Sequence, residues 1–365
     1  MSMARKFRLT EASMCDAQDT GTLMTQAVPE VSCQQAQALI WQYYGLQGDV
    51  ILLTGERDKN FCLTVPSGRR YMLKVINAAE SVAESHYQTA LLLHVAQQAA
   101  ALPVPRVVLT RYQQAEPVVD IDGNALRIRL VSFLEGTPLH AVTPSIALME
   151  SLGSTLAQLD VALSRFSHPA QQRQLLWDIS RAEQIRPYLA FVHDAEQQRA
   201  ITQILRRYDR HVTPQLKTLR QQTIHNDMNP HNVLADVGDV TRVSGIIDFG
   251  DALYAPLIND LATALAYQVH DGDDPFAFIV PFTASYHAHL PLTEQEIALL
   301  PDLIMTRLAL IVTIAQWRAA RYPENRDYLL RNLPRSWRSL QQITGYSHDR
   351  FCQRIWQGIR EINNG

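Results

Sequence analysis

Three side chains able to hold a metal ion or move a proton stand at a fixed spacing in the second half of the chain. His225, Asp227 and Asn232 form the pattern H-x-D-x-x-x-x-N, and sixteen residues after Asn232 an apolar pair runs into Asp248, which begins the triplet DFG. This spacing suits the transfer of a phosphoryl group from a nucleotide to a hydroxyl group. Such a transfer needs positioned groups and cations that neutralise oxygen charge, and it needs little covalent chemistry from the protein.

Each residue of this pattern has a predicted role. Asp227 would orient the acceptor hydroxyl group and accept its proton. Mg²⁺ takes one or two carboxylate or amide oxygens and keeps the rest of its shell for phosphate and water, so Asn232 and Asp248 are the predicted metal ligands, as in the general kinase template. The alternative is that Asp227 and Asn232 lie in a turn around Pro230 and that DFG is a strand end. The H-x-D-x-x-x-x-N pattern and the DFG triplet, present together in this order and at this gap, favour the catalytic interpretation.

The composition is that of an ordered globular protein. The chain has 365 residues, which is long for one hydrophobic core and suits two domains or lobes. Hydrophobic residues make up 47% and charged residues 19%. The formal net charge of −3 and the isoelectric point near 6.5 give no basic surface for a polynucleotide, so we expect no nucleic-acid partner.

The cysteines and the apolar runs of the sequence indicate the cellular compartment of the protein. The four cysteines are Cys15, Cys33, Cys62 and Cys352. They form no C-x-x-C pair and are expected to be reduced thiols of a cytosolic protein. No apolar run follows the basic residues near the N-terminus, so no secretory signal is expected. The run Leu308–Ala315 is far shorter than the about 20 residues that span a bilayer. We therefore expect a cytoplasmic protein without a membrane partner.

The pattern of apolar residues changes along the chain. Residues 1–26 are polar and are expected to form an N-terminal arm, and helical spacing runs from Ser32 to Tyr44 and from Ala83 to Gln98. Strands with intervening turns are expected at Val50–Leu53, Phe61–Val65, Tyr71–Ile76, Arg106–Thr110 and Ala125–Phe133. From Ser145 the pattern is helical almost to the end. This predicts an α+β, bilobal fold: an antiparallel sheet lobe over residues 27–133 and a larger helical lobe over 134–365 that carries the catalytic loop and the acceptor site.

The sheet lobe contains candidates for holding a nucleotide. Lys74 lies in the middle of an apolar strand, where a phosphate and a carboxylate would offset the cost of burying its ammonium group. Glu84 is the chosen carboxylate and Glu80 the alternative. Lys74 would instead face solvent if the strand simply alternates.

Two backbone segments complete the predicted nucleotide site. The segment from Thr54 to Phe61, with Gly55 and Asn60, lies where a loop over the phosphates belongs, although an ordinary hairpin turn has the same composition. The backbone of Ser132 to Glu135, with Ser132 and Leu134, could hydrogen-bond a purine edge, and a plain linker is the alternative. No G-x-x-x-x-G-K-S/T motif is present, which excludes a P-loop kinase.

With these residues the chain resembles the aminoglycoside phosphotransferase and choline kinase superfamily, small-molecule kinases that share the protein-kinase fold. Within it, the chain is most similar to the hydroxylysine kinases and their bacterial relatives. The segments that carry the resemblance are Tyr71–Val75, Arg129–Leu139, His168-Pro169, Leu176–Asp178, Ile224–Asn229, Gly245–Asp251, Pro323–Asn325 and Tyr328–Leu329. Pro230-His231 departs from the family pattern and bears on the substrate. The resemblance implies that Asp260 braces the catalytic loop, and a helix cap is the alternative.

The resemblance also implies Mg²⁺, ATP or GTP as co-substrate, and a small hydroxylated amine as acceptor. Hydroxylysine carries a carboxylate in addition. Arg307 and Arg318 are eleven residues apart and return to the same side of a helix, in a stripe with Ile311 and Ile314. One of the two arginines could hold a carboxylate, and structural ion bridges are the alternative. Candidates for the amine end, each with a structural alternative, are Trp177, Asp178 and Asp251.

Three functions compete at this point. The first is a kinase for an amino alcohol or hydroxy amino acid. The second is an aminoglycoside or choline/ethanolamine kinase of the same fold, which a strongly acidic pocket would favour. The third is a nucleotide-binding regulator without turnover, against which Lys74, Asp227, Asn232 and Asp248 stand together.

Overall fold

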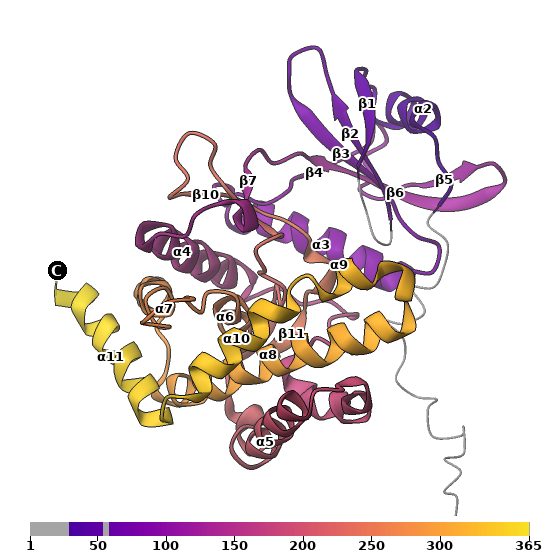
Figure 1. Cartoon of the computed structure of the whole chain (residues 1–365). Coiled ribbons are helices and arrows are strands. Elements are labelled where there is room, and N and C mark those ends of the chain that lie inside the picture. The colour runs from indigo at the N-terminus through magenta and orange to yellow at the C-terminus, as the bar shows by residue number, and fades with distance from the viewer. Residues whose placement is uncertain (1–28, 54–57, 365) are drawn as a thin grey trace, which may run out of the picture.

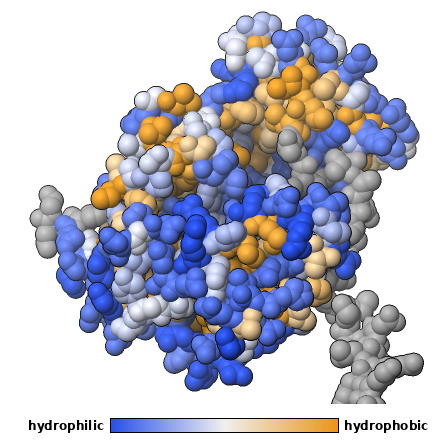
Figure 2. Space-filling model, in the orientation of Figure 1, coloured by the Kyte–Doolittle hydropathy of each residue, from blue (hydrophilic) through white to orange (hydrophobic). Residues whose placement is uncertain are grey.

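The computed structural model describes residues 29–53 and 58–364, so the expected arm over residues 1–26 lies outside it. An N-terminal sheet lobe stands on a larger helical lobe (Figure 1). The expected α+β fold with two lobes is confirmed. In the view of Figure 2 the helical lobe is mostly hydrophilic outside, whereas hydrophobic residues gather on the sheet lobe.

The strand pairs of the sheet that the structure describes are all antiparallel. Its strands are β1 (Asp49–Leu53), β2 (Lys59–Thr64), β3 (Arg70–Val75), β4 (Val107–Val108), β5 (Val118–Ile121) and β6 (Asn124–Ser132). The order is β1-β2-β3-β6-β4, with β5 paired to β6. Alternate residues such as Phe61, Leu73 and Leu130 are buried against α2 (Cys33–Tyr44). Ser32 caps the start of α2, and Gly45 ends it with φ 71°.

Strand β5, and with it the hairpin that β5 forms with the expected strand β6, was absent from the expected elements. Its turn residues, Asp122 and Gly123, have φ of 52° and 82°. Two consecutive positive φ values make the type I′ turn that suits the twist of a hairpin, and Asp-Gly is a preferred sequence for it. The sequence therefore held a signal for this hairpin.

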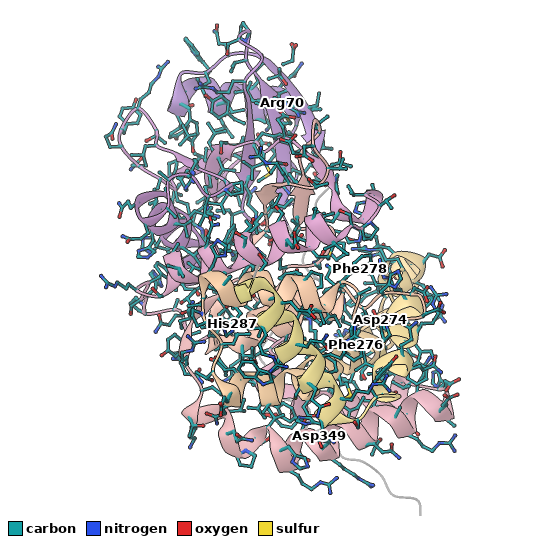
Figure 3. The ribbon with its side chains drawn as sticks, turned by 90° about the vertical axis from the view of Figure 1, so that its left-hand side faces the viewer. Arg70, Asp274, Phe276, Phe278, His287 and Asp349 are labelled. Atoms are coloured by element: carbon teal, nitrogen blue, oxygen red, sulfur yellow. The ribbon has the colours of Figure 1, made fainter. Side chains whose placement is uncertain are left out.

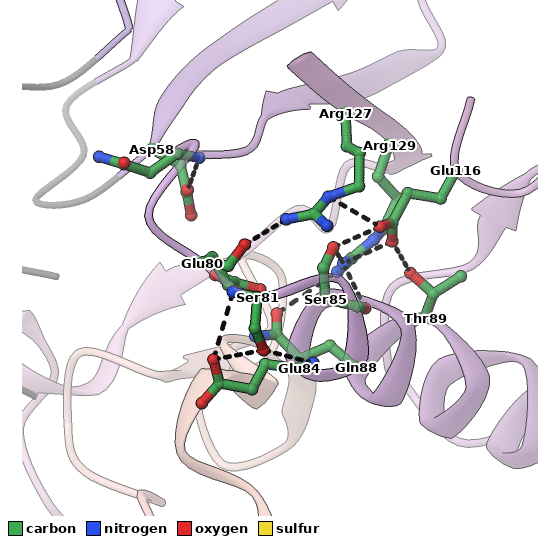
Figure 4. A network of polar contacts seen from close by, with 11 residues as sticks. Asp58, Glu80, Ser81, Glu84, Ser85, Gln88, Thr89, Glu116, Arg127 and Arg129 are labelled. Atoms are coloured by element: carbon green, nitrogen blue, oxygen red, sulfur yellow. Dashed lines mark hydrogen bonds and ion pairs between the residues drawn. The ribbon is translucent and has the colours of Figure 1, made fainter. Parts of the chain in front are cut away.

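Helix α3 (Val82–Gln98) lies beneath the sheet and is held to it by buried polar contacts (Figure 4). Arg129 of β6 donates to the carbonyl oxygen of Ser85 (3.0 Å) and pairs with Glu116 (3.1 Å). Glu116 also accepts hydrogen bonds from the hydroxyl groups of Ser85 and Thr89. Since the partners are buried and share their hydrogen bonds, the network fixes α3 relative to the sheet.

The helical lobe surrounds one long central helix. The helices are α4 (Ile146–Leu163), α5 (Ala195–His211), α6 (Ile258–Ala266), α7 (Ile279–His289), α8 (Glu294–Arg321), α9 (Arg326–Leu330), α10 (Leu333–Thr344) and α11 (His348–Asn364). Among the described helices, α4 and α8 are long and apolar enough to cross a membrane. In the most apolar 18-residue stretch of each, however, 56% and 89% of the residues are buried inside the protein. Both are the kind of helix that builds a core.

The last helix closes the core of this lobe. The ring of Phe276, which precedes α7, meets the rings of Tyr346 and Phe351 edge to face, each with a centroid distance of 4.8 Å. Figure 3 shows Phe276 and Asp274 in the helical lobe, far from Arg70 in the sheet lobe. Asp274 accepts a hydrogen bond from Arg354 of α11 (2.6 Å). These contacts anchor α11 to the segment that leads into α7.

Short strands interrupt the helical lobe around the predicted catalytic residues. They are β7 (Thr137–Pro138), β8 (Gln221–Ile224), β9 (Val233–Ala235), β10 (Val243–Ile246) and β11 (Leu253–Pro256). Strand β11 pairs with β8, and β9 pairs with β10. The loop between β8 and β9 therefore lies beside the turn between β10 and β11.

Candidate active site

A cavity of about 860 Å³ lies between the lobes. Its walls come from β1 to β3, the segment between the lobes, the loops after β8 and β10, α8, α9 and the two residues before α10. It contains all but two of the predicted site residues that the structure describes: Lys74, Asn60, Ser132, Leu134, Asp227, Asn232, Asp248, Asp251, Trp177, Arg307 and Arg318 line it. Glu84 and Asp178 do not line the cavity, and neither does Ile314 of the expected arginine stripe. Gly55 lies outside the described residues.

His225 joins the two halves of the catalytic sequence. Its ring is buried, and Nδ1 accepts a hydrogen bond from the backbone N–H of Asp227 (3.2 Å). Since Nδ1 accepts, Nε2 carries the proton and donates to the carbonyl oxygen of Ile247 (3.1 Å). One imidazole thus connects the residue that would accept a proton to the residue that precedes Asp248.

Asp260 braces the catalytic loop, as the resemblance implied. Its two carboxylate oxygens accept hydrogen bonds from the backbone N–H groups of His225 and Asn226, both at 2.8 Å. Asn226 has φ 64°, a backbone conformation that these two bonds help to hold. Behind Asp260 lies the fully buried Asp160, which accepts a hydrogen bond from the hydroxyl group of Tyr286 (2.6 Å). Burial, and the nearby charge of Asp260, raise the pKa of Asp160 well above its usual range.

The two oxygens of the Asp227 carboxylate have different partners. Oδ2 accepts hydrogen bonds from Nδ2 of Asn232 (2.8 Å) and Nδ2 of Asn229 (3.0 Å). Oδ1 accepts one from Nη2 of Arg307 (3.2 Å). Burial and the charge of Asp251 raise the pKa of Asp227 to about 7, against the opposing effects of Arg307 and Asn229. A carboxylate with such a raised pKa is a stronger proton acceptor than an exposed one.

Asn232 and Asp248 present oxygens suited to a divalent cation. Both hydrogen bonds that Asn232 donates from Nδ2 go to Asp227, which turns its amide oxygen away from that residue. Oδ1 of Asp248 accepts from the N–H of Gly250 (3.1 Å), and no donor in the described part of the chain reaches the other oxygen. The N–H of Ile247 donates to the carbonyl oxygen of Asn232 (2.9 Å) and keeps the two segments together. One amide and one carboxylate fit Mg²⁺, which takes its other ligands from phosphate and water.

Lys74 pairs with a residue that the sequence did not suggest. Its Nζ lies 2.8 Å from Oδ2 of Asp58, whose Oδ1 accepts a hydrogen bond from the N–H of Asn77 (2.8 Å). Burial tends to lower the pKa of Lys74, but Asp58 and the more distant Asp248 raise it above its usual value. Lys74 therefore keeps its charge inside the cavity, as a phosphate-binding group must.

The expected pairing of Lys74 with Glu84 is wrong. Glu84 accepts a hydrogen bond from the hydroxyl group of Ser81 (2.8 Å), while the Ser81 hydroxyl accepts one from the N–H of Glu84 (3.2 Å). This capping box starts α3 and turns Glu84 away from the segment of Asp58 (Figure 4). Glu84 also pairs with Arg173 at 3.5 Å. The sequence S-x-x-E at residues 81–84 carried this information. The alternative, Glu80, is buried and accepts from Gln88 (3.1 Å).

The Asp58 pair is testable by stability. We expect Asp58→Asn to lower the free energy of unfolding by about 1–3 kcal/mol, because a partly buried ammonium group loses its counter-charge. Glu84→Gln, which keeps the capping box, should change it by less than about 0.5 kcal/mol. Denaturant unfolding of both variants measures the difference. A nucleotide should recover part of the loss in Asp58→Asn, since phosphates can replace the carboxylate. Equal stabilities of the two variants would refute the pairing.

The segment between the lobes is the predicted contact for a purine edge. The N–H groups of Ser132 and Phe133 donate to the carbonyl oxygens of Arg106 (2.8 Å) and Arg70 (3.1 Å). Among the described residues, no backbone oxygen accepts a hydrogen bond from the N–H of Leu134. The nearby apolar wall of the cavity consists of Leu53, Met72, Leu134, Leu234 and Ile247. Leu134, rather than Ser132, therefore supplies the N–H suited to a purine edge.

The acceptor end of the cavity differs from the expectation in two ways. Asp178 is buried and starts a 3-10 helix (Ile179–Phe191), where it accepts a hydrogen bond from the N–H of Ser180 (2.8 Å) and pairs with Arg181 (3.8 Å). Its role is structural because it is committed to these neighbours. Ile314 is fully buried in the core, and Ala315 takes its place in the wall.

Sequence reasoning missed further residues in the wall. They are Asn229, His231, Tyr267, Tyr328, Arg331 and Asn332. Asn229 follows Asp227 by two residues, a position from which its amide can reach the carboxylate. The last three come from the segment after α8. The sequence of that segment showed a resemblance to the family, but no residue in it was predicted to bind a substrate.

The family model described as "Phosphotransferase enzyme family" matches residues 50–294. The hydroxylysine kinase of Mus musculus is 26% identical over 352 residues, covering 90% of this chain and 93% of the relative. The homoserine kinase of Methylobacillus flagellatus is 29% identical over 262 residues, covering 71% and 75%. A solved amicoumacin kinase in complex with AMP-PNP and Ca²⁺ has a TM-score of 0.60 at 16% identity, covering 83% of this chain and 93% of that one.

Proposed function

The chain belongs to the phosphotransferase enzyme family, and we propose that it is a Mg²⁺-dependent kinase that transfers the γ-phosphoryl group of ATP or GTP to a hydroxyl group of a small hydroxy amino acid or amino alcohol. The observation that carries the proposal is the convergence of Lys74, Asp227, Asn232 and Asp248 on one cavity. A nucleotide-binding protein without turnover does not need a proton acceptor such as Asp227 beside the proposed metal ligands.

The residues have separate tasks in the proposed reaction. Lys74 binds phosphate oxygens, and the N–H of Leu134 meets the edge of the base. Asn232 and Asp248 hold Mg²⁺, which when bound neutralises charge on the phosphate oxygens. Asp227 orients the acceptor hydroxyl group for attack in line with the leaving oxygen and accepts its proton.

A hydroxy amino acid is the acceptor class that we favour. Hydroxylysine and homoserine kinases are named for substrates that carry an ammonium and a carboxylate group as well as a hydroxyl group. The wall of the cavity contains a carboxylate, Asp251, and two arginines, Arg318 and Arg331. Opposite charges in one pocket suit a zwitterion. A polycationic aminoglycoside or choline would be better served by a wall without those arginines.

The acceptor class is tested by comparing a hydroxy amino acid with its decarboxylated amine. We expect hydroxylysine, or a similar hydroxy amino acid, to have a kcat/KM at least about 10²-fold higher, because the amine cannot make the ion pair that the substrate carboxylate makes with an arginine of the wall. Arg318→Ala should remove this preference mainly by raising KM for the amino acid. Arg321→Ala, on the same helix but exposed and outside the cavity wall, is the matched control and should keep it.

The same assay separates the competing functions. The panel contains hydroxy amino acids, amino alcohols, choline and kanamycin, each with ATP and with GTP. A higher kcat/KM for choline or kanamycin than for every hydroxy amino acid would overturn the acceptor class and leave the kinase intact. Absence of Mg²⁺-dependent nucleotide turnover with or without any acceptor would overturn the kinase itself.

A further inference from the structure

Arg307 is a charged side chain in the middle of the helical core. It is the largest of the fully buried side chains, with 1% of its surface exposed, and it lies on α8 between Thr306 and Leu308, neither of which is exposed. A guanidinium group withdrawn from water in this way destabilises the fold unless nearby groups balance its charge and satisfy its donors. The partners of Arg307 therefore indicate why it is there.

Two groups at the cavity wall accept hydrogen bonds from the Nη atoms of Arg307. Nη1 donates to the carbonyl oxygen of Trp177 (2.7 Å), and the guanidinium carbon lies 5.3 Å from the centre of the Trp177 ring. Nη2 donates to Oδ1 of Asp227 (3.2 Å). The phenol of Tyr267 lies beside them: burial raises its pKa, and Arg307 acts in the opposite direction. Because Arg307 is buried and each of its Nη atoms already donates to a neighbouring group, it is poorly placed for a bidentate contact with a substrate carboxylate.

The two carboxylate oxygens of Asp227 accept different numbers of hydrogen bonds. Oδ2 already accepts two hydrogen bonds, from Asn229 and Asn232 of its own loop. Oδ1 accepts only the one from Arg307 among the described residues. A carboxylate oxygen has two lone pairs in the plane of the group, so Oδ1 keeps one for another donor.

We propose that Arg307 is a positioning residue that locks the Asp227 carboxylate between α8 and the catalytic loop, so that Oδ1 faces the acceptor hydroxyl group. This rests on the proposed kinase activity. In the step concerned, the hydroxyl oxygen forms a bond to the γ-phosphorus, and the bond from that phosphorus to the bridging oxygen breaks. Its electron pair leaves with the nucleoside diphosphate, and the hydroxyl proton moves to Oδ1 of Asp227.

The kinetic signature differs from that of a carboxylate-binding arginine. A residue that acts through the base affects every acceptor alike, since each of them must give up its proton to Asp227. A residue that binds the acceptor carboxylate affects only acceptors that have one. We therefore expect Arg307→Met to lower kcat by about 10²-fold for a hydroxy amino acid and for its decarboxylated amine, with KM of each changed by less than about threefold. Arg307→Lys, which keeps the charge, should recover part of the rate.

A double variant tests whether the two residues act together. In the Asp227→Asn background, Arg307→Met should lower kcat by less than about twofold, because the group that Arg307 positions has already lost its function. The double variant also removes both charges of the buried pair, so it remains measurable if Arg307→Met alone leaves Asp227 unbalanced and unfolds the protein. Nucleotide titration of each variant reports whether its fold is intact.

Three results would overturn parts of this scheme in distinguishable ways. If Arg307→Met raises KM for the amino acid and leaves the amine unaffected, Arg307 binds the acceptor carboxylate and the inference fails. If the effects of Arg307→Met and Asp227→Asn multiply, Arg307 acts independently of Asp227 and the inference also fails. If Asp227→Asn itself retains more than half of the activity, the assignment of the base in the proposed function fails first.

Discussion

Asp227→Asn is expected to lower kcat by about 10²- to 10⁴-fold and to leave nucleotide affinity nearly unchanged. An amide has almost the size of a carboxylate and can still meet the donors from Asn229 and Asn232. It cannot accept the proton of the acceptor hydroxyl group. Steady-state kinetics with saturating nucleotide, together with nucleotide titration, measure both quantities.

Asp239→Asn is a suitable control for that variant. Asp239 is an exposed carboxylate in the turn between β9 and β10, where it accepts hydrogen bonds from Thr241. Its replacement should leave kcat within about twofold, as expected for a surface substitution outside the site. A fall in nucleotide affinity as large as the fall in kcat of Asp227→Asn would show that Asp227 supports the nucleotide rather than the acceptor.

Asp248→Ala is expected to abolish measurable turnover and to weaken nucleotide binding mainly when Mg²⁺ is present. The reason is that Asp248 and Asn232 are the two protein ligands proposed for the ion, and its remaining ligands come from phosphate and water. Asp248 is the only charged residue of the two, so its replacement by alanine removes the negative charge that attracts the ion. Nucleotide titrations of wild type and variant, each with Mg²⁺ and with a chelator, separate the metal-dependent part of binding from the rest.

The wild-type titration decides this prediction by itself. If nucleotide binds the wild-type chain equally well with and without Mg²⁺, the metal assignment of Asp248 and Asn232 is wrong. If instead the variant loses the same affinity in chelator as in Mg²⁺, Asp248 acts on the structure of the loop. Its φ of 62° and its hydrogen bond from Gly250 would then be its contribution.

The fold could be predicted in large part because the strands of the sheet lobe alternate and end at turn residues. The expected ranges of β1, β2, β3 and β6 lie within two residues of the observed ones. The small strands β8 to β11 were missed since three or four residues are too few to show a period. The pairing of such strands depends on contacts that are distant in sequence. Strands β8 and β11, for example, are about 30 residues apart.

The site could be predicted where its residues stand close together in sequence. Asp227, Asn232 and Asp248 lie within one stretch, and the structure brings them to one cavity. The partner of Lys74 could not be found in this way, because Asp58 and Glu84 are equally plausible by charge. Only the capping box of α3 distinguishes them. The pairing of Arg307 with Asp227 joins residues 80 positions apart, and no local pattern reports it.

The division of the pocket between the lobes has a practical consequence for changing this protein. Lys74 and Asp58 belong to the sheet lobe, whereas Asp227, Arg307 and Arg318 belong to the helical lobe, where Asp260 fixes the catalytic loop from behind. Under the proposed function, we expect substitutions in the part of the wall after Arg307 to change acceptor selectivity while nucleotide affinity stays the same. Laboratory evolution towards a new hydroxylated substrate would best randomise the wall from Ala315 to Asn332 and leave the braced loop untouched.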